Sequence, residues 1–462
     1  MEAKPRRLLP RYGLLLSQDQ LLRNGVLLTL ASLATALLGA AYWSLAGLRY
    51  DVADVGRGYS AVSMMMFLAG AAQLNLSDVL VRFTPSAGRQ TRRLILLSYL
   101  TAVVTAMVVA AGFVLLIPRL APGLDALHSP LMGAVFVAST MAYAVFVLQD
   151  GALTGLRRAS WVLAENSLFS SVKLIAVLAF SVIAAAQGIM LSWTIGLLVS
   201  LVFTNAYLFG WAVPDREREL RRVAQLPLPD GETHREATEP VSGVVRYMAL
   251  TYVGGLCWLA ATSLPQVLLL NMLGARASAY FSVSWVITSM LYLVSANMGY
   301  SLVVEAVGDP GRLALAVRTV LRRTGAALLL AVLVLLAAAP LVLRLFGPGY
   351  PGHAGALLRL LVLSALPNLV NSTALASFRV QRRLRSFVLV DAGLCAAVFG
   401  LAALLVPHLG VVGMGVAWLG AQSATAGILL LCRSSWMPAA AENEGDLRRR
   451  SAAQTAADTY PG

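Results

Sequence analysis

The residue that stands out first is a lysine inside a long apolar stretch. Lys173 lies about thirteen residues from either end of the stretch 160–186, and the chain contains only one other lysine. A helix rises about 1.5 Å per residue, so this position lies near the middle of a bilayer core about 30 Å thick. A charge at that depth costs about 2.5 to 3.5 kcal/mol on insertion scales and normally faces protein or a water-filled cavity. Asn166 and Ser170 share its helical face, which predicts that this face forms the floor of a cavity.

Four acidic residues lie within a few turns of the predicted cytoplasmic surface: Asp78, Asp150, Glu165 and Asp391. Carboxylates inside a membrane commonly mark proton or cation sites, so all four are candidates for ion coupling. They fit equally well as hydrated partners of the arginines in nearby loops. Glu165 cannot reach Lys173 directly, because eight residues of helix separate them by roughly 12 Å and about 80° of rotation. An interhelical pair of Lys173 with Asp78 or Asp391 stays open as the structural alternative to a ligand site.

A polar stripe is predicted on the second apolar stretch. Asn75, Asp78 and Arg82 are spaced by three and four residues, which places them on one face of a single helix. A structural ion pair near the membrane interface explains this stripe as well as a functional site does.

Two prolines at mid-depth stand beside amide side chains. Pro265 precedes Gln266 and should kink its helix, which frees a carbonyl group. Pro367 precedes Asn368, with Asn371 one turn later. This combination favours a bend or a polar lumen over plain helix packing.

The sequence shows no arrangement typical of an enzyme. It has no phosphate-binding loop, no His or Cys spacing typical of metal ligands, and no Ser, His and Asp set. The four histidines lie in predicted loops, and the three cysteines lie in apolar stretches where packing is the favoured role. We therefore expect no enzymatic activity, no cofactor and no metal site.

The composition is that of a helical membrane protein. Of the 462 residues, 58% are hydrophobic and 13% are charged, a balance that a polytopic membrane protein needs and a soluble fold does not. The apolar stretches are long and do not alternate with polar residues, so they predict helices and not barrel strands. We predict an all-α polytopic membrane protein with twelve transmembrane helices, at 25–48, 59–81, 94–117, 131–154, 160–186, 189–213, 244–270, 278–304, 325–346, 355–377, 387–406 and 411–432.

The positive charges set the predicted topology. With the N-terminus inside, the inward segments hold 29 Lys and Arg residues and the outward segments hold 6, which places both termini on the cytoplasmic side of the plasma (inner) membrane. The same clustering beside apolar stretches accounts for the net charge of +14 without nucleic acid. The predicted units are a cytoplasmic N-terminal segment 1–24, an N-terminal six-helix bundle 25–213, a cytoplasmic linker 214–243, a C-terminal six-helix bundle 244–432 and a disordered cytoplasmic tail 433–462.

A weak internal repeat supports two equivalent halves. Gly58–Ser60 opens the helix after the first span, and Ala279–Ser282 opens the helix after the seventh. Trp193 and Trp418 each lie in the last helix of a half, after a tight return that contains glycine. Two equivalent halves suggest a central pathway at their interface, as in many transporters.

Several diffuse motifs extend over nearly the whole chain, from about residue 20 to 432. They are Arg23–Gly25, Leu48–Tyr50 with Asp54–Gly56 and Tyr59, Leu345–Tyr350 with Leu357–Leu360, and Leu409–Gly413. Through these motifs the chain resembles the polysaccharide flippases of the multidrug/oligosaccharidyl-lipid/polysaccharide exporter superfamily, the group that includes O-antigen and capsule repeat-unit flippases. None of the motifs is catalytic, so they identify the superfamily better than the substrate.

The resemblance implies a V of two six-helix bundles that moves its cargo by alternating access. The implied cargo is an oligosaccharide on polyprenyl pyrophosphate, used for cell-surface polysaccharide biosynthesis. Membrane lipids and other polysaccharide-assembly proteins are the further partners expected. Such a cargo needs a cation for its anionic group and hydroxyl, amide or aromatic partners for its sugars. The candidates for the anionic group are Lys173, Arg82 and Arg49, and those for the sugar are Thr251, Trp258, Gln266, Asn297, Asn368 and Asn371.

Three alternatives remain. Drug exporters of the superfamily commonly carry an acid in the first span, and residues 25–48 contain none. Lipid II flippases typically have fourteen spans and basic residues in the eighth, whereas residues 278–304 contain neither Arg nor Lys. These absences favour the repeat-unit flippases over a cation-coupled small-molecule exporter and over a lipid II flippase. A membrane-embedded sugar polymerase or ligase is disfavoured, because the longest outward loop has only about a dozen residues.

Overall fold

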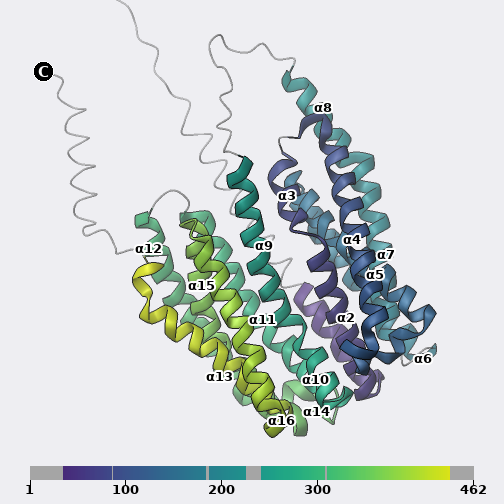
Figure 1. The fold of residues 1–462 in the computed structure, drawn as a ribbon, viewed down its shortest axis with the longest axis vertical. Coiled ribbons are helices and arrows are strands. Elements are labelled where there is room, and N and C mark those ends of the chain that lie inside the picture. The colour runs from purple at the N-terminus through teal and green to yellow at the C-terminus, as the bar shows by residue number, and fades with distance from the viewer. Residues whose placement is uncertain (1–34, 86, 184–186, 225–240, 307–309, 438–462) are drawn as a thin grey trace, which may run out of the picture.

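The computed structural model describes residues 35–85, 87–183, 187–224, 241–306 and 310–437. All regular secondary structure in these ranges is helical (Figure 1), which confirms the predicted all-α polytopic class. The predicted N-terminal segment 1–24, the start of the first span, most of the linker and the tail from 438 onward lie outside the described residues. The described part of the tail contains a short turn, Arg433–Ser435, and the buried Trp436, whose indole N–H donates to the Leu429 carbonyl (2.8 Å).

The N-terminal bundle begins with a helix over residues 35–49. It continues with α2 (Val52–Ala72), α3 (Leu76–Phe83), α4 (Thr91–Leu120), α5 (Pro130–Gly155), α6 (Ala159–Ile183), α7 (Gly188–Tyr207), the π turn η3 (Leu208–Ala212) and α8 (Val213–Ala224). Short 3₁₀ segments η1 (Gly88–Gln90) and η2 (Pro122–His128) connect some of them.

The C-terminal bundle is built in the same way. It contains α9 (Val241–Ser263), α10 (Pro265–Leu273), α11 (Ala275–Ala306), α12 (Pro310–Thr319), the π turn η4 (Val320–Thr324), α13 (Gly325–Arg344), α14 (Tyr350–Leu363), α15 (Ala365–Val380) and α16 (Leu384–Leu431). Figure 1 shows the purple and blue helices of the first bundle beside the green and yellow helices of the second.

Most of the predicted spans correspond to helices of the described residues. Nine helices there are long and apolar enough to cross a membrane, and the bent pair α2 and α3 makes a tenth. Helix α16 joins two helices at Gly410, where φ is 60° and ψ is −142°, and Leu401 before this point lies against Gly420 after it. The two halves are therefore antiparallel and raise the number of crossing segments to eleven. The first predicted span is described only from residue 35, so the count of twelve stays a prediction.

The second predicted span is not one continuous helix. Its helix ends at Ala72 and resumes at Leu76 with a bend of 53°. Leu74 and Asn75 between them have φ values of 51° and 60°, a conformation that asparagine tolerates better than most residues because its side chain can bond locally. The single stripe predicted through Asn75 is therefore wrong, because that residue precedes the first turn of α3.

The other breaks lie at or near the prolines. Helix α9 ends at Ser263 and α10 starts at Pro265, which confirms the predicted kink, because proline has no N–H to continue the helix. Helices α14 and α15 are interrupted at Ser364, three residues before Pro367. Both interruptions leave polar backbone groups inside the C-terminal bundle.

The two bundles meet mainly where α2 packs against α9, α10 and α11. Ser60 Oγ on α2 lies 2.9 Å from Ser278 Oγ on α11, and it donates to the main-chain carbonyl of Gln266 (3.3 Å). Gly56 lies so close to α11 that a Cβ atom there would be 1.9 Å from the Ala275 carbonyl oxygen. The seam therefore depends on small residues, as is common between membrane helices.

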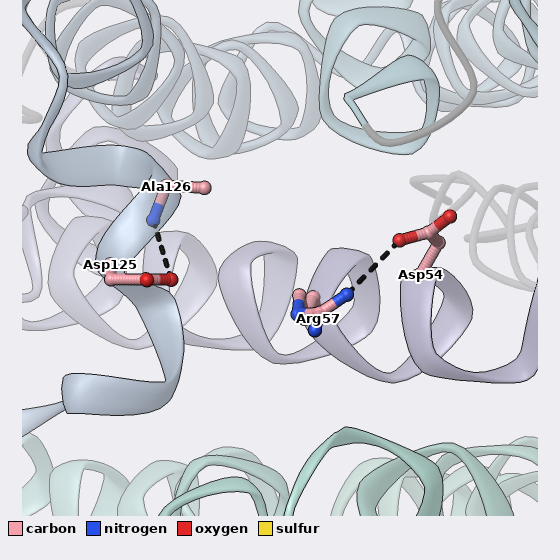
Figure 2. Close-up of polar contacts among 4 residues, drawn as sticks. All are labelled: Asp54, Arg57, Asp125 and Ala126. Atoms are coloured by element: carbon pink, nitrogen blue, oxygen red, sulfur yellow. Dashed lines mark hydrogen bonds and ion pairs between the residues drawn. The ribbon is translucent and has the colours of Figure 1, made fainter.

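Two acids in the region after the first span and before α5 are satisfied locally (Figure 2). Asp54 pairs with Arg57 one turn later on α2 (3.2 Å), and Asp125 accepts from the Ala126 N–H within η2 (2.9 Å). These contacts join near neighbours in the sequence, so they stabilise local turns and do not connect the bundles.

Gly56→Val should destabilise the protein. The new side chain would displace α2 from α11, and overpacking of this kind costs typically about 1–3 kcal/mol or more. The measurement is the thermal unfolding midpoint in detergent, which should fall by several degrees. The control is Gly400→Ala, where no atom lies within 4 Å of an added Cβ. Equal midpoints for the two variants would contradict the described seam.

Candidate functional site

The C-terminal bundle encloses a cavity of about 360 Å³ between α9, α11, α15 and the first half of α16. Small-molecule sites have volumes of roughly 300–1,000 Å³, so this cavity fits a small ligand. Its lining combines aromatic, amide and charged side chains: Trp258, Tyr292, Ser289, Asn368, Asn371, Ser372, Arg379, Phe387 and Asp391, with aliphatic residues between them.

The aromatic wall of the cavity is held by hydrogen bonds. The rings of Trp258 and Tyr292 are nearly parallel, with centroids 6.3 Å apart and an interplanar angle of 23°. The Tyr292 hydroxyl accepts from the indole N–H of Trp418 (2.8 Å) and lies 2.8 Å from Ser364 Oγ at the break before α15. Buried hydroxyl and indole groups rarely lack partners, and here they partner each other. The wall is therefore preorganised without a ligand.

The amides of α15 form a second side of the cavity. Asn371 Nδ2 donates to Gln422 Oε1 (2.7 Å) and to the Gln422 carbonyl (3.1 Å). Asn371 Oδ1 and Gln422 Nε2 are buried and have no hydrogen-bond partner among the described residues. Asn368 is also buried and contacts Ser372 one turn later. Unsatisfied buried polar atoms are costly, so a polar ligand group here would be favoured.

The cavity also contains two charged side chains of opposite sign. Asp391 on α16 is 3% exposed, and its carboxylate lies against Gly254 of α9. The Arg379 guanidinium lies 4.5 Å from the centre of the Phe387 ring. Within the described residues, no ion pair joins either group to another side chain. The positive charge of Arg379 nevertheless acts on the Asp391 carboxylate across the cavity. A buried carboxylate that is not directly paired can still take up a proton, a metal cation or an organic cation.

A second polar cluster lies inside the N-terminal bundle. Asp150 on α5 accepts from Asn166 Nδ2 on α6 (3.2 Å). Glu165, also on α6, is 1% exposed, and neither of its carboxylate oxygens has a hydrogen-bond partner among the described residues. The Ser200 hydroxyl of α7 donates to the main-chain carbonyl of Glu165 (3.2 Å). The structure thus brings two of the four predicted coupling acids to the packed centre of α5, α6 and α7.

Lys173 is enclosed by aromatic rings. Its Nζ atom lies 4.3 Å from the ring centre of Trp193, 4.4 Å from that of Phe169 and 5.2 Å from that of Tyr42. Its side chain is 6% exposed, and no hydrogen bond or ion pair to another described residue is present. The interhelical pair with Asp78 or Asp391 is therefore absent. Cation–π contacts with three desolvated rings replace it and stabilise the ammonium.

The remaining candidate residues lie apart from this cavity. Arg49 is exposed at the end of the first helix, while Asp78 and Arg82 are exposed on α3, beyond the far end of α2. The three predicted cations therefore do not share one site. Thr251 accepts from Asn75 Nδ2 (3.3 Å) at the seam between the bundles. Gln266 is buried at the same seam and Asn297 is half-buried on α11.

The cavity thus combines Trp258, Asn368, Asn371 and Asp391 from the predicted set. Tyr292 and Arg379 also line the cavity and were not among the candidates, nor were Trp418 and Gln422, which hydrogen-bond to the lining residues Tyr292 and Asn371. A signal for Tyr292 exists in the sequence, because Ser289, Tyr292, Ala296 and Gly299 follow helical spacing on α11 and all line the cavity.

The two bundles carry a buried carboxylate at matching positions. Glu165 precedes Trp193 by 28 residues, and Asp391 precedes Trp418 by 27. Each acid lies in the fifth predicted span of its bundle and each tryptophan in the sixth. This extends the internal repeat from the turns, where the sequence showed it, to the buried charges.

The arrangement of two helical bundles with broken helices is the fold of solved MATE structures. The chain is similar to the inward-facing conformation of a multidrug resistance MATE family transporter of the MOP superfamily, with a TM-score of 0.62, 15% identity, and coverage of 86% of this chain and 93% of that one. It is also similar to an outward-facing conformation of such a transporter, with a TM-score of 0.54, 16% identity, and coverage of 91% and 94%.

A third solved structure, of MATE in the bent conformation, gives a TM-score of 0.57 at 15% identity and covers 88% of this chain and 94% of that one. No protein-family model and no curated protein matches the chain. At these identities the likeness establishes the fold. The superfamily to which the sequence motifs point, and its polysaccharide branch, both stay predictions.

Lys173→Met should leave the thermal unfolding midpoint unchanged or raise it. No carboxylate loses its partner, and replacing a buried charge with an apolar side chain of similar length is often neutral or stabilising. Unfolding of the purified protein in detergent measures this. Lys173→Glu is the comparison and should lower the midpoint, because a carboxylate is repelled by the faces of the rings. A large loss of stability in Lys173→Met would show that Lys173 has an ionic partner.

Proposed function

We propose that this chain is a secondary transporter that exports a small amphipathic organic cation, bound in the cavity of the C-terminal bundle. The observation that carries the proposal is the lining of that cavity. Trp258 and Tyr292 supply nearly parallel apolar faces, and Asp391 supplies a buried negative charge that no direct ion pair neutralises within the described residues, although Arg379 acts on it from the same cavity. Aromatic faces beside a carboxylate are the combination that recognises an organic cation.

The size of the cavity also supports a small cargo. At about 360 Å³ it is far smaller than a lipid-linked oligosaccharide would require. Arg49, Arg82 and Lys173, the three groups expected to bind a pyrophosphate, are separated, and the last is enclosed by rings. The multidrug exporters with similar structures agree with this choice.

Alternating access supplies the transport step. The contacts between the bundles run along α2, with further contacts from Gly47 of the first helix to Phe346 and from Gly123 of η2 to Asn271 of α10. Rocking would take place about this seam. The TM-score is higher for the inward-facing neighbour than for the outward-facing one, which supports an inward-facing state. Rigid-body rocking of one bundle against the other would then expose the C-terminal cavity to alternate sides.

Asp391→Asn and Trp258→Ala should each reduce transport of a lipophilic cation such as ethidium by tenfold or more. A tenfold loss corresponds to about 1.4 kcal/mol, within the range expected for one charge or one stacking face. Uptake into inverted vesicles measures it. The matched control is Asn297→Ala, whose side chain lies on α11 outside the cavity lining. Wild-type transport in both cavity variants would contradict the proposal.

Glu165 is the proposed coupling acid of the N-terminal bundle. It is buried without a hydrogen-bond partner for its carboxylate among the described residues, so the charged form is costly and a proton or cation stabilises it. Binding there would alter the packing of α5, α6 and α7 and so favour one orientation of the bundle.

Glu165→Gln should abolish the pH dependence of transport over the pH range in which the protein stays folded, because glutamine cannot exchange a proton. The control is Asp54→Asn, whose carboxylate is half-buried and paired with Arg57 (3.2 Å). Transport rates of both variants across this pH range are the measurement. A pH profile of Glu165→Gln that equals that of the wild type would place coupling elsewhere.

The second candidate function is translocation of a lipid-linked oligosaccharide. The absence of any acid from residues 25–48 favours it, because drug exporters of the superfamily commonly carry one there. Under this proposal Trp258, Asn368 and Asn371 bind one sugar of a cargo whose lipid stays in the membrane.

Complementation separates the two functions. The chain is expressed in a host that lacks its repeat-unit flippase. If the chain exports small molecules, it should lower ethidium accumulation and leave surface polysaccharide absent. If it is a flippase, it should restore surface polysaccharide and leave ethidium accumulation unchanged. Restored polysaccharide that depends on Asp391 would overturn the first proposal.

A further inference from the structure

Two adjoining cavities lie at one end of the N-terminal bundle, where the turn between α5 and α6 meets η3 and α8. Their volumes are about 370 Å³ and 200 Å³, and both are lined by Arg158 and Asp215. The larger one also contacts Tyr207, Trp211 and Arg218, and the smaller one contacts Arg157 and Arg216. This is the end that the charge distribution predicts to face the cytoplasm. The cavities lie far along the chain from the C-terminal site and share no residue with it.

The turn between α5 and α6 fixes two arginines side by side. Arg157 has a φ of 60°, and the N–H of Arg158 bonds to the Leu153 carbonyl (2.8 Å), which closes the end of α5. Arg158 forms an ion pair with Asp215 of α8. Arg157 and Arg218 are exposed and form no ion pair within the described part of the chain. The two cavities together are lined by four arginines, Arg157, Arg158, Arg216 and Arg218, and by one acid, Asp215, so they keep an excess of positive charge.

An aromatic strip leads from these arginines along the outer surface of α7. Trp161 stacks on Tyr207 with ring centres 3.4 Å apart and also contacts Phe203 (5.8 Å). Trp211 lies in the π turn η3 and is 70% exposed. Tryptophan and tyrosine are enriched where lipid headgroups meet the hydrocarbon. Val202 and Phe203 continue the strip with exposed apolar surface on α7.

We propose that this site binds the headgroup of an anionic phospholipid, with the phosphate between Arg157, Arg158 and Arg218. Guanidinium groups bind phosphate oxygens through paired charge-assisted hydrogen bonds. The Trp211 indole would lie at headgroup depth, and an acyl chain would follow the apolar face of α7. Basic pockets beside membrane helices on the cytoplasmic side suit such lipids because that leaflet carries negative charge. The π turn contributes by turning Trp211 outward beside the arginines.

Thermal unfolding of the full-length protein in a neutral detergent tests the proposal. Phosphatidylglycerol should raise the midpoint by several degrees, and phosphatidylcholine should not. The double variant Arg157→Gln/Arg218→Gln should lose the phosphatidylglycerol shift. The matched control, Arg119→Gln/Arg344→Gln, changes two exposed arginines elsewhere and should keep it. Arg218→Gln alone serves as the test if the double variant does not fold.

Three outcomes would overturn the proposal. They are an equal shift with both lipids, a shift retained in the arginine variants, and a shift of the same size with inorganic phosphate alone. The last would identify a site for free anions. Retention of one phosphatidylglycerol molecule in native mass spectra of the wild type, and its loss from the arginine variants, would give independent support. None of these measurements depends on the exported solute, so they stand or fall apart from the proposed transport function.

Discussion

Hydrocarbon offers no hydrogen-bond partners, so every polar group that enters the membrane must find one inside the protein. The positions of the helix breaks follow from this constraint. Asn75 at the break after α2 donates to Thr251 of the other bundle (3.3 Å), and Ser364 at the break before α15 bonds the Tyr292 hydroxyl (2.8 Å). The Gln266 carbonyl just after Pro265 accepts from the Ser278 hydroxyl (3.0 Å). These three breaks thus lie at the seam and at the wall of the C-terminal cavity.

The same constraint divides the buried charges between the bundles. In the N-terminal bundle, Lys173 is stabilised by aromatic faces and Glu165 has no carboxylate partner within the described residues. In the C-terminal bundle, Asp391 lies at the wall of an open cavity. Equivalent helices of the two halves therefore carry equivalent acids in different surroundings. This difference suits separate roles, with ion coupling proposed for the first bundle and solute binding for the second.

Sequence reasoning predicted the positions of the helices well, and the contacts between helices poorly. Long apolar stretches predicted most spans, and Pro265 predicted the break between α9 and α10. Both predictions succeeded because each signal lies in the local sequence. The break after Ala72 contains neither proline nor glycine. Hydrogen bonds with α9 stabilise this break. The Tyr252 hydroxyl donates to the Ala71 carbonyl (2.6 Å), and Asn75 Nδ2 donates to the Thr251 hydroxyl (3.3 Å). Such contacts join residues far apart in sequence, and no local pattern encodes them.

The candidate site shows the same limit. Trp258, Asn368, Asn371 and Asp391 were predicted as polar or aromatic residues within spans, but their meeting in one cavity depends on how four helices pack. Lys173 was predicted at the floor of a cavity, whereas the structure encloses it with the rings of Trp193 and Tyr42, which come from two other helices. The most direct test of the central proposal is an experimental density map of the transporter bound to a lipophilic cation. The proposal predicts ligand density between Trp258 and Tyr292, in contact with Asp391; density found only between the two bundles would contradict it.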